Sequence, residues 1–145
     1  MKRVTQAICL ILILSMTLAI PAFAAESSTW ASNYFMSYSH YLWKISDTHF
    51  QVWFEVAAVR TMDELGASEV RVQRSSDGVN WETVATYSMD DYSDMICTNT
   101  VSHSSCVDYY DAEPGYYYRG RVDYYAKRGN GMASNTKYTS TITMP

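Results

Sequence analysis

A strictly alternating segment, residues 116–127, constrains the fold of this chain more than any other feature. It follows a Pro114-Gly115 pair and precedes the turn-forming sequence Gly129-Asn130-Gly131. One set of alternate side chains is apolar or small, namely Tyr116, Tyr118, Gly120, Val122, Tyr124 and Ala126. The intervening set is mostly charged, namely Tyr117, Arg119, Arg121, Asp123, Tyr125 and Lys127. Because successive side chains of a strand point to opposite faces, this pattern predicts a β-strand with one buried face.

Other segments carry the same signal. His49–Ala58 alternates between apolar and mostly polar residues, with Trp53 on the outward side. Shorter strands are predicted at the following ranges: Ser68–Arg74, Trp81–Ser88, Cys106–Tyr110 and Lys137–Thr143. Tyr34–Ile45 is aromatic-rich but ambiguous in parity, and Thr61–Gly66 carries a capping box that predicts one helical turn. Short strands separated by turn signals predict an all-β fold, an antiparallel β-sandwich of about seven strands.

The N-terminus has the pattern of a secretory signal peptide. Lys2 and Arg3 precede an apolar run at residues 7–20, and Ala22-Phe23-Ala24 supplies a small-x-small cleavage pattern. The alternative, a membrane anchor, needs about 20 apolar residues. We therefore expect a signal peptide at 1–24, a flexible leader at 25–33 and the sandwich at 34–145. The product is then secreted, extracellular and not attached to a membrane.

The charge of the mature chain excludes one class of partner. Cleavage removes Lys2 and Arg3, which takes the formal net charge of −4 two units lower, to −6. An acidic protein repels phosphate backbones, so we expect no nucleic-acid partner. We expect the partner to be an extracellular protein or a glycan.

Two cysteines remain after cleavage, Cys97 and Cys106. A pair of cysteines in an exported chain predicts a disulfide. The alternatives are two free thiols, or a metal site that includes His103 between them. Cys-x5-His-x2-Cys is not a zinc spacing, so we expect no metal and no cofactor.

The corner before the alternating strand resembles that of fibronectin type III domains. The matching residues are Pro114, Gly115, Tyr118 and Val122, followed by a turn at Gly129-x-Gly131-x-x-Ser134. The resemblance implies an immunoglobulin-like sandwich in which the Tyr118 hydroxyl ties back to the corner backbone. Gly120 departs from that pattern, because the family has a bulky core residue there.

The mature sequence also resembles a group of small proteins secreted by Gram-positive bacteria. The shared marks are Thr61–Ala67, Ser75-x-Asp77-Gly78-x-x-Trp81 and Tyr116-Tyr117-Tyr118. No activity is established for that group, so the resemblance implies a compartment and a fold rather than a function.

For two motifs, a structural role is a better interpretation than a catalytic or metal-binding role. Ser75-x-Asp77-Gly78-x-x-Trp81 is close to the Asp-box hairpin, which predicts a β-turn beside a core tryptophan. The acidic loop Asp90–Asp94 offers carboxylates to calcium, but calcium needs six to eight oxygens in a defined loop geometry. We expect a solvated acidic loop, and calcium binding is left open.

We expect no enzymatic activity and assign no catalytic residue. His40, His49 and His103 lie in no nucleophile or metal motif, and His49 falls on an outward strand position.

The aromatic content is high, with 13 tyrosines and 4 tryptophans. Trp53, Tyr117 and Tyr125 are predicted to point outward and are the candidate ligand-binding residues. Tyr117 and Tyr125 lie roughly 27 Å apart along a strand, and Trp53 is expected on the other sheet. A glycan platform therefore requires Tyr41, Trp43 or Tyr138 to complete a patch beside one of them. We expect a non-enzymatic binding or interaction module; a carbohydrate-binding module is the alternative.

Overall fold

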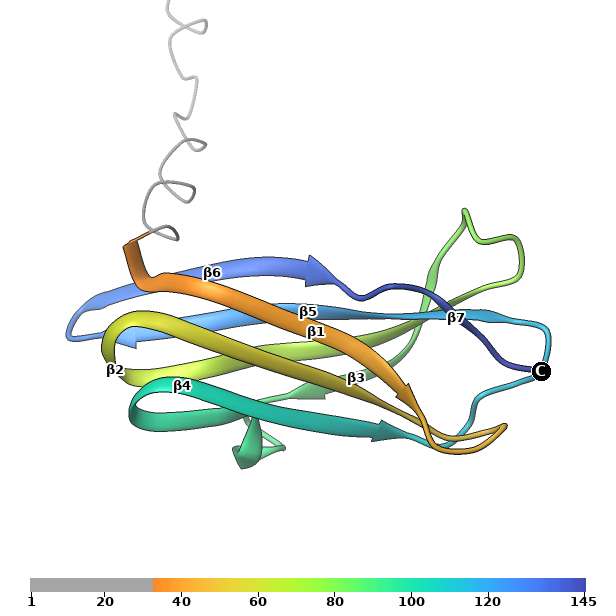
Figure 1. Ribbon diagram of the computed structural model, residues 1–145, viewed down its shortest axis with the longest axis horizontal. Helices are drawn as coiled ribbons and strands as arrows, with labels where there is room; N and C mark the ends of the chain where they lie inside the picture. Colours follow the sequence, from red (N-terminus) through yellow and green to blue (C-terminus); the bar gives the residue numbers. More distant parts are fainter. Residues whose placement is uncertain (1–32) are drawn as a thin grey trace, which may run out of the picture.

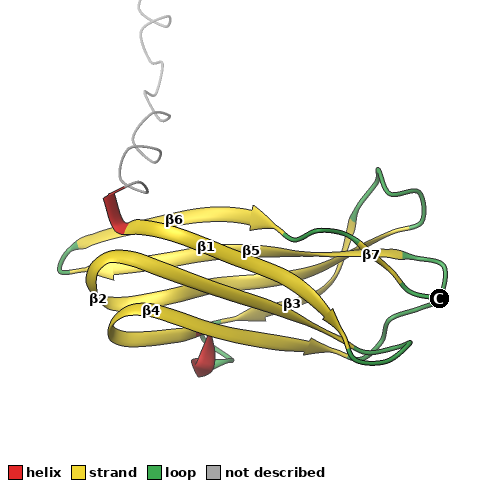
Figure 2. Cartoon of the chain, in the orientation of Figure 1, coloured by secondary structure: helices red, strands yellow, loops and turns green. Residues whose placement is uncertain are grey.

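Seven β-strands and one 3₁₀ turn follow one another along residues 33–145, the part of the chain that the computed structural model describes (Figures 1 and 2). They are β1 (Phe35–Lys44), β2 (Phe50–Ser75), β3 (Glu82–Ser88), η1 (Ser93–Met95), β4 (Ile96–Tyr109), β5 (Tyr117–Arg128), β6 (Gly131–Tyr138) and β7 (Ile142–Thr143). Every pairing is antiparallel, which confirms the predicted all-β antiparallel class. The predicted signal peptide and nearly all of the predicted leader lie outside the described residues. Within 33–145, no helix has the length and apolarity needed to span a membrane.

Strand β2 serves both layers of the fold. Its first half, residues 50–58, pairs with β1 on one side and β4 on the other. Its second half, residues 64–75, pairs with β5 on one side and with β3 and the start of β4 on the other. β6 extends this second layer beyond β5. Figure 1 shows β2 and β4 turning back at the same end of the molecule, so the arrangement is that of a β-sandwich.

Aromatic side chains from the two layers meet between them. The rings of Phe50 and Tyr118 have centroids 5.3 Å apart, and those of Phe54 and Tyr124 are 6.3 Å apart. All four side chains are essentially fully buried. The Tyr124 hydroxyl donates to the Ser39 carbonyl at 2.9 Å, and burial raises the pKa of Tyr124 above its ordinary value. The buried face predicted for β5 therefore packs in the interior.

The corner before β5 is closed by one buried side chain. The Tyr118 hydroxyl accepts a hydrogen bond from the backbone N–H of Glu113 at 2.8 Å. Gly115, which follows Pro114, has a φ of 80°, a conformation that glycine adopts without strain. Its N–H donates to the carbonyl of Met144 at 3.0 Å, which fixes the C-terminal segment against the corner.

Residues 61–66 form strand rather than the predicted helical turn. Glu64 pairs with β4 on one side and with β5 on the other, so hydrogen-bonded ladders on both sides override the local capping signal. Gly66 permits a close approach here, because a Cβ at this position would lie 2.0 Å from the carbonyl oxygen of Met95. The final strand is predicted at Lys137–Thr143, whereas β6 begins at Gly131 and ends at Tyr138.

The predicted disulfide between Cys97 and Cys106 is wrong, because both cysteines are free. Both cysteines lie in β4, in which Cys97 lies opposite Leu65 and Cys106 opposite Trp53. Cys97 pairs with the second half of β2 and Cys106 with the first half, so the two cysteines lie on either side of the point at which β4 turns back (Figure 1).

The free state of the two cysteines is open to a direct measurement. We expect an alkylating reagent, added to the freshly purified protein in denaturant without reductant, to modify both Cys97 and Cys106. Reduction beforehand should leave the number of modified thiols unchanged. A mass gain of two hydrogens on reduction, with no alkylation before it, would contradict the structure.

A methyl group at Gly120 has no room in the core. Its Cβ would lie 2.6 Å from Val52 Cγ1 and 3.1 Å from Thr139 Cγ2. We expect Gly120→Ala to lower the free energy of unfolding by about 1–3 kcal/mol, measured by urea denaturation. In the double variant with Val52→Ala the combined loss should be smaller than the sum of the single losses, because the shorter side chain frees the space. Additive losses would show that these two positions do not compete for the same volume.

Candidate functional site

The outer face of the β1–β2–β4 layer gathers aromatic and polar side chains in two neighbouring rows. Strand register places Trp43 beside Gln51, and Gln51 beside Asp108. The next row holds Tyr41 beside Trp53, which in turn lies opposite Cys106. Alternation along each strand sends these side chains to the same face. The consecutive strands β1 and β2 and the more distant β4 therefore build one surface.

Tyr41, Trp43 and Trp53 form what we call the aromatic patch. The rings of Tyr41 and Trp53 are nearly parallel, with an angle of 4° and centroids 6.2 Å apart. Tyr41 is 45% exposed and Trp43 is 57% exposed, so both present apolar area to solvent. Together with Gln51 the patch lines a surface depression of about 180 Å³. Exposed aromatic area of this kind indicates a binding surface, because covering it with a ligand lowers the free energy.

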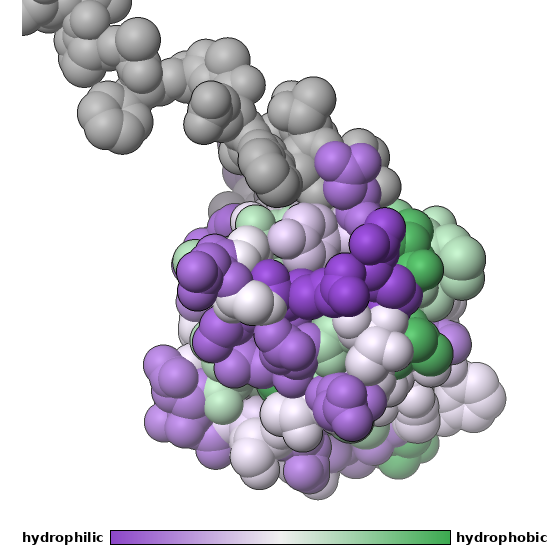
Figure 3. Space-filling view, turned by 90° about the vertical axis from the view of Figure 1, so that its left-hand side faces the viewer, coloured by the Kyte–Doolittle hydropathy of each residue, from purple (hydrophilic) through white to green (hydrophobic). Residues whose placement is uncertain are grey.

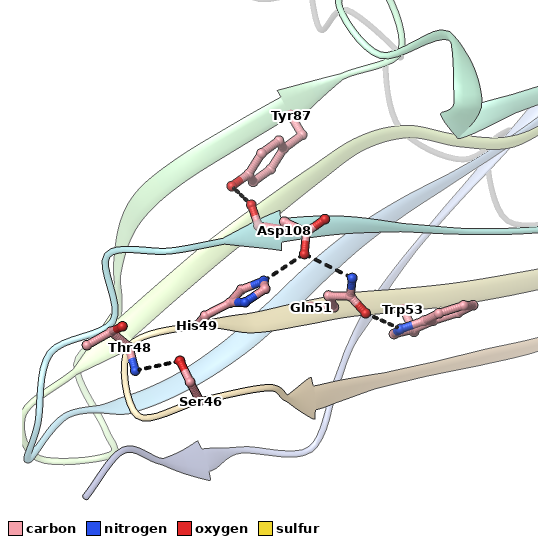
Figure 4. Close-up of polar contacts among 7 residues, drawn as sticks. All are labelled: Ser46, Thr48, His49, Gln51, Trp53, Tyr87 and Asp108. Atoms are coloured by element: carbon pink, nitrogen blue, oxygen red, sulfur yellow. Dashed lines mark hydrogen bonds and ion pairs between the residues drawn. The ribbon is translucent and has the colours of Figure 1, made fainter.

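A chain of hydrogen bonds fixes Trp53 in place (Figure 4). Its indole Nε1 donates to Gln51 Oε1 at 3.0 Å, and Gln51 Nε2 donates to Asp108 Oδ1 at 2.9 Å. The same Oδ1 accepts a hydrogen bond from His49 Nε2 at 2.7 Å. The His49 ring in turn stacks on Tyr110, with centroids 4.2 Å apart. These contacts set the orientation of the indole before any ligand arrives, which reduces the entropy that binding must overcome.

The structure separates the three candidate ligand-binding residues. Trp53 lies in the aromatic patch, whereas Tyr117 and Tyr125 lie on β5 in the other layer. The Tyr125 hydroxyl donates to Glu64 Oε2 at 3.1 Å, and burial together with that carboxylate raises the pKa of Tyr125. Tyr117 is 38% exposed. Neither tyrosine contributes to a surface with Trp53.

Sequence reasoning did not assign Gln51, Asp108 or His49 to a site. The sequence predicts Tyr41 and Trp43 only as conditional members of a patch, because the parity of their segment is ambiguous. The ambiguity has a physical cause: Tyr38, on the other face of β1, is as aromatic as Tyr41 and packs its ring against Tyr124. The register between β1 and β2, which no local pattern encodes, decides which rings lie beside Trp53.

The Asp-box-like segment is a structural turn. Asp77 Oδ1 accepts hydrogen bonds from the N–H groups of Val79 and Asn80, both at 2.8 Å, and these bonds hold the pKa of Asp77 well below its usual range. The prediction that Trp81 is a core residue is wrong. It is half-buried on the surface, where the guanidinium of Arg119 lies 4.2 Å from the centroid of its ring.

The acidic loop and the histidines do not assemble a metal centre. Among residues 33–145, no group of three or more His, Cys, Asp or Glu side chains is placed to hold a metal ion. His103 Nε2 lies 2.8 Å from the carbonyl oxygen of Asp94, and His40 Nδ1 lies 3.3 Å from the Tyr124 hydroxyl. Each histidine thus has its own structural partner.

The end of the sandwich at which β2 and β4 turn back presents a different surface. Figure 3 views this end, and hydrophilic residues dominate the middle of it.

Comparisons with known proteins identify no relative of this chain, so the function must be inferred from the geometry of the site. No protein-family model matches the chain, and neither does a curated protein or a solved structure. The fold and site define the class of a small β-sandwich with an exposed, pre-oriented aromatic surface.

The support of Trp53 is open to a mutational test. We expect Asp108→Ala to lower the free energy of unfolding by about 2 kcal/mol, because His49 and Gln51 lose a charged acceptor. The tryptophan fluorescence of the protein should change as well, because Gln51 no longer holds the indole of Trp53 in place. Asp111→Ala is the matched control: the side chain is exposed and makes no hydrogen bond with a described residue, so a change within about 0.5 kcal/mol is expected. Equal losses in the two variants would refute a specific role for Asp108.

Proposed function

We propose that this protein is a secreted, non-enzymatic binding module that holds a glycan on the aromatic patch. The observation that carries the proposal is the side-by-side placement of Tyr41, Trp43 and Trp53 with the amide of Gln51. A sugar ring has a face of C–H groups that packs on an aromatic ring, and hydroxyls at its rim that bond to amide and carboxylate groups. The patch offers both kinds of contact within one depression.

We further propose that the sandwich is fibronectin type III-like, in the wider immunoglobulin-like class. The seven strands support this assignment, since β2 joins them into one antiparallel sheet that is folded into two layers. So does the hydrogen bond that ties the Tyr118 hydroxyl back to the corner backbone. The likeness bears on architecture alone, because sandwiches of this class carry many unrelated functions.

Secretion by a Gram-positive bacterium completes the proposal. It rests on the basic start, apolar run and Ala22-Phe23-Ala24 pattern, which lie outside the described residues, and on the resemblance to small secreted proteins. Cell-wall and environmental glycans are the ligands that such a protein meets.

A glycan array probed with the purified protein tests the proposal. We expect binding in the micromolar range, and we expect Trp53→Ala to weaken it roughly tenfold or more, about 1.4 kcal/mol. Tyr117→Ala is the matched control, because it removes an exposed aromatic residue from the other layer and should leave the affinity unchanged.

Two outcomes would overturn this function. One is the absence of any glycan signal at high micromolar protein, and the other is equal loss of binding in the Trp53 and Tyr117 variants. Circular dichroism of each variant shows that the fold is retained, so that a loss of binding is not a loss of structure.

A further inference from the structure

A second, larger hollow adjoins the aromatic patch. It has a volume of about 440 Å³ and lies between β4 and the segment that runs from the end of β3 to η1. The residues that concern its chemistry are three tyrosines and three aspartates: Tyr87, Tyr92, Tyr110, Asp91, Asp94 and Asp108. Lysine, arginine and histidine do not occur among its lining residues. The hollow therefore combines aromatic faces with negative charge.

The aspartates make this hollow electronegative. Asp91 and Asp94 are exposed, and their carboxylates accept no hydrogen bond from a described residue. Burial and, next, neighbouring groups that include Asp108 raise the pKa of Tyr87 to about 12. Burial and the charge of Asp108 likewise raise the pKa of the Cys106 thiol. Two different groups at the hollow thus respond to the same negative charge.

The tyrosines add a second attraction for a cation. The rings of Tyr87 and Tyr92 meet edge to face, with centroids 5.3 Å apart and an angle of 66°. Tyr110 is 63% exposed, and its stacking on His49 holds its ring at the border of the hollow. The negatively charged face of an aromatic ring attracts ammonium groups, and carboxylates beside it strengthen that attraction.

Asp108 joins the hollow to the aromatic patch. Its Oδ1 holds Gln51, a member of the patch depression, while Asp108 itself lines the hollow. Figure 4 shows Asp108 with Tyr87 on one side and Gln51 and Trp53 on the other. Cys106, opposite Trp53 in the ladder, lines the hollow too. A ligand that lies on the patch therefore has the hollow directly beside it.

We propose that the bound glycan is cationic: an amino sugar with free amines, whose ammonium group enters the hollow while a neighbouring ring stacks on the aromatic patch. This inference rests on the glycan-binding function proposed above and specifies its ligand class. The net charge of the chain, −4, also favours a cationic ligand over a neutral or anionic one.

The experiment compares oligomers of glucosamine with oligomers of N-acetylglucosamine of the same length; the sugar rings are the same, and N-acetylation replaces each ammonium group by a neutral acetamide. Binding is measured by calorimetry near pH 6, where amines of this kind are protonated. We expect the glucosamine oligomer to bind at least tenfold more tightly at low salt and to lose this advantage at high salt. The double variant Asp91→Asn/Asp94→Asn should abolish the preference and leave the N-acetylated oligomer unaffected. Asp90→Asn, next to the hollow but not lining it, is the matched control and should keep the preference.

The outcomes separate this inference from the function on which it rests. Equal affinity for the two oligomers would overturn the cationic ligand, and a preference that survives Asp91→Asn/Asp94→Asn would overturn the hollow as the site of its ammonium group. Either result leaves a glycan module in place. Binding of the glucosamine oligomer that survives Trp53→Ala would uphold the hollow and overturn the role of the patch. Failure of both oligomers to bind would overturn the inference, and the glycan array then decides the broader function.

Discussion

The structure depends on one strand that belongs to both layers. β2 runs for 26 residues without a loop, and each half pairs with different partners. Because its side chains alternate, the register of the first half sends Phe50 and Phe54 inward and leaves Trp53 outside. In the second half, no side chain fits at Gly66, where the backbone of Met95 approaches. Core, layers and candidate site thus follow from the path of β2.

The division of the aromatic residues between core and surface follows from that path. Tyr118 and Tyr124 are buried with their hydroxyls bonded to backbone groups, the first as an acceptor from Glu113 and the second as a donor to Ser39. A buried hydroxyl without such a partner costs free energy, so these two tyrosines are committed to the fold. High aromatic content alone is therefore a poor sign of a binding surface. A binding surface is indicated instead by a group of aromatic rings that are not buried in the core.

Local sequence patterns predicted the strands whose alternation is strong. They failed at segments whose structure is determined by pairing with other strands. β5 and the first half of β2 carry period-two signals that tertiary structure reinforces. Residues 61–66 have a helical cap signal, yet the ladders on both sides make them strand. The disulfide prediction rested on the presence of two cysteines in an exported chain, whereas the structure places Cys97 and Cys106 in β4 as free thiols. Of the candidate site, only Trp53 is predicted outright, and Tyr41 and Trp43 are conditional members. Their neighbours on other strands, such as Asp108, meet Trp53 through strand register.

Asp108 links the candidate site to the packing of the two layers. Its carboxylate holds Gln51 and His49 on the outer face of the β1–β2–β4 layer. Its backbone carbonyl accepts a hydrogen bond at 2.6 Å from the hydroxyl of Tyr87, a residue of β3 in the opposite layer. The orientation of Trp53 and the walls of the adjacent hollow are therefore set by the same residue, and they depend on how the layers pack. A site held in this way is rigid on both sides, which suits recognition of a ligand that must contact an aromatic surface and a charged hollow at once.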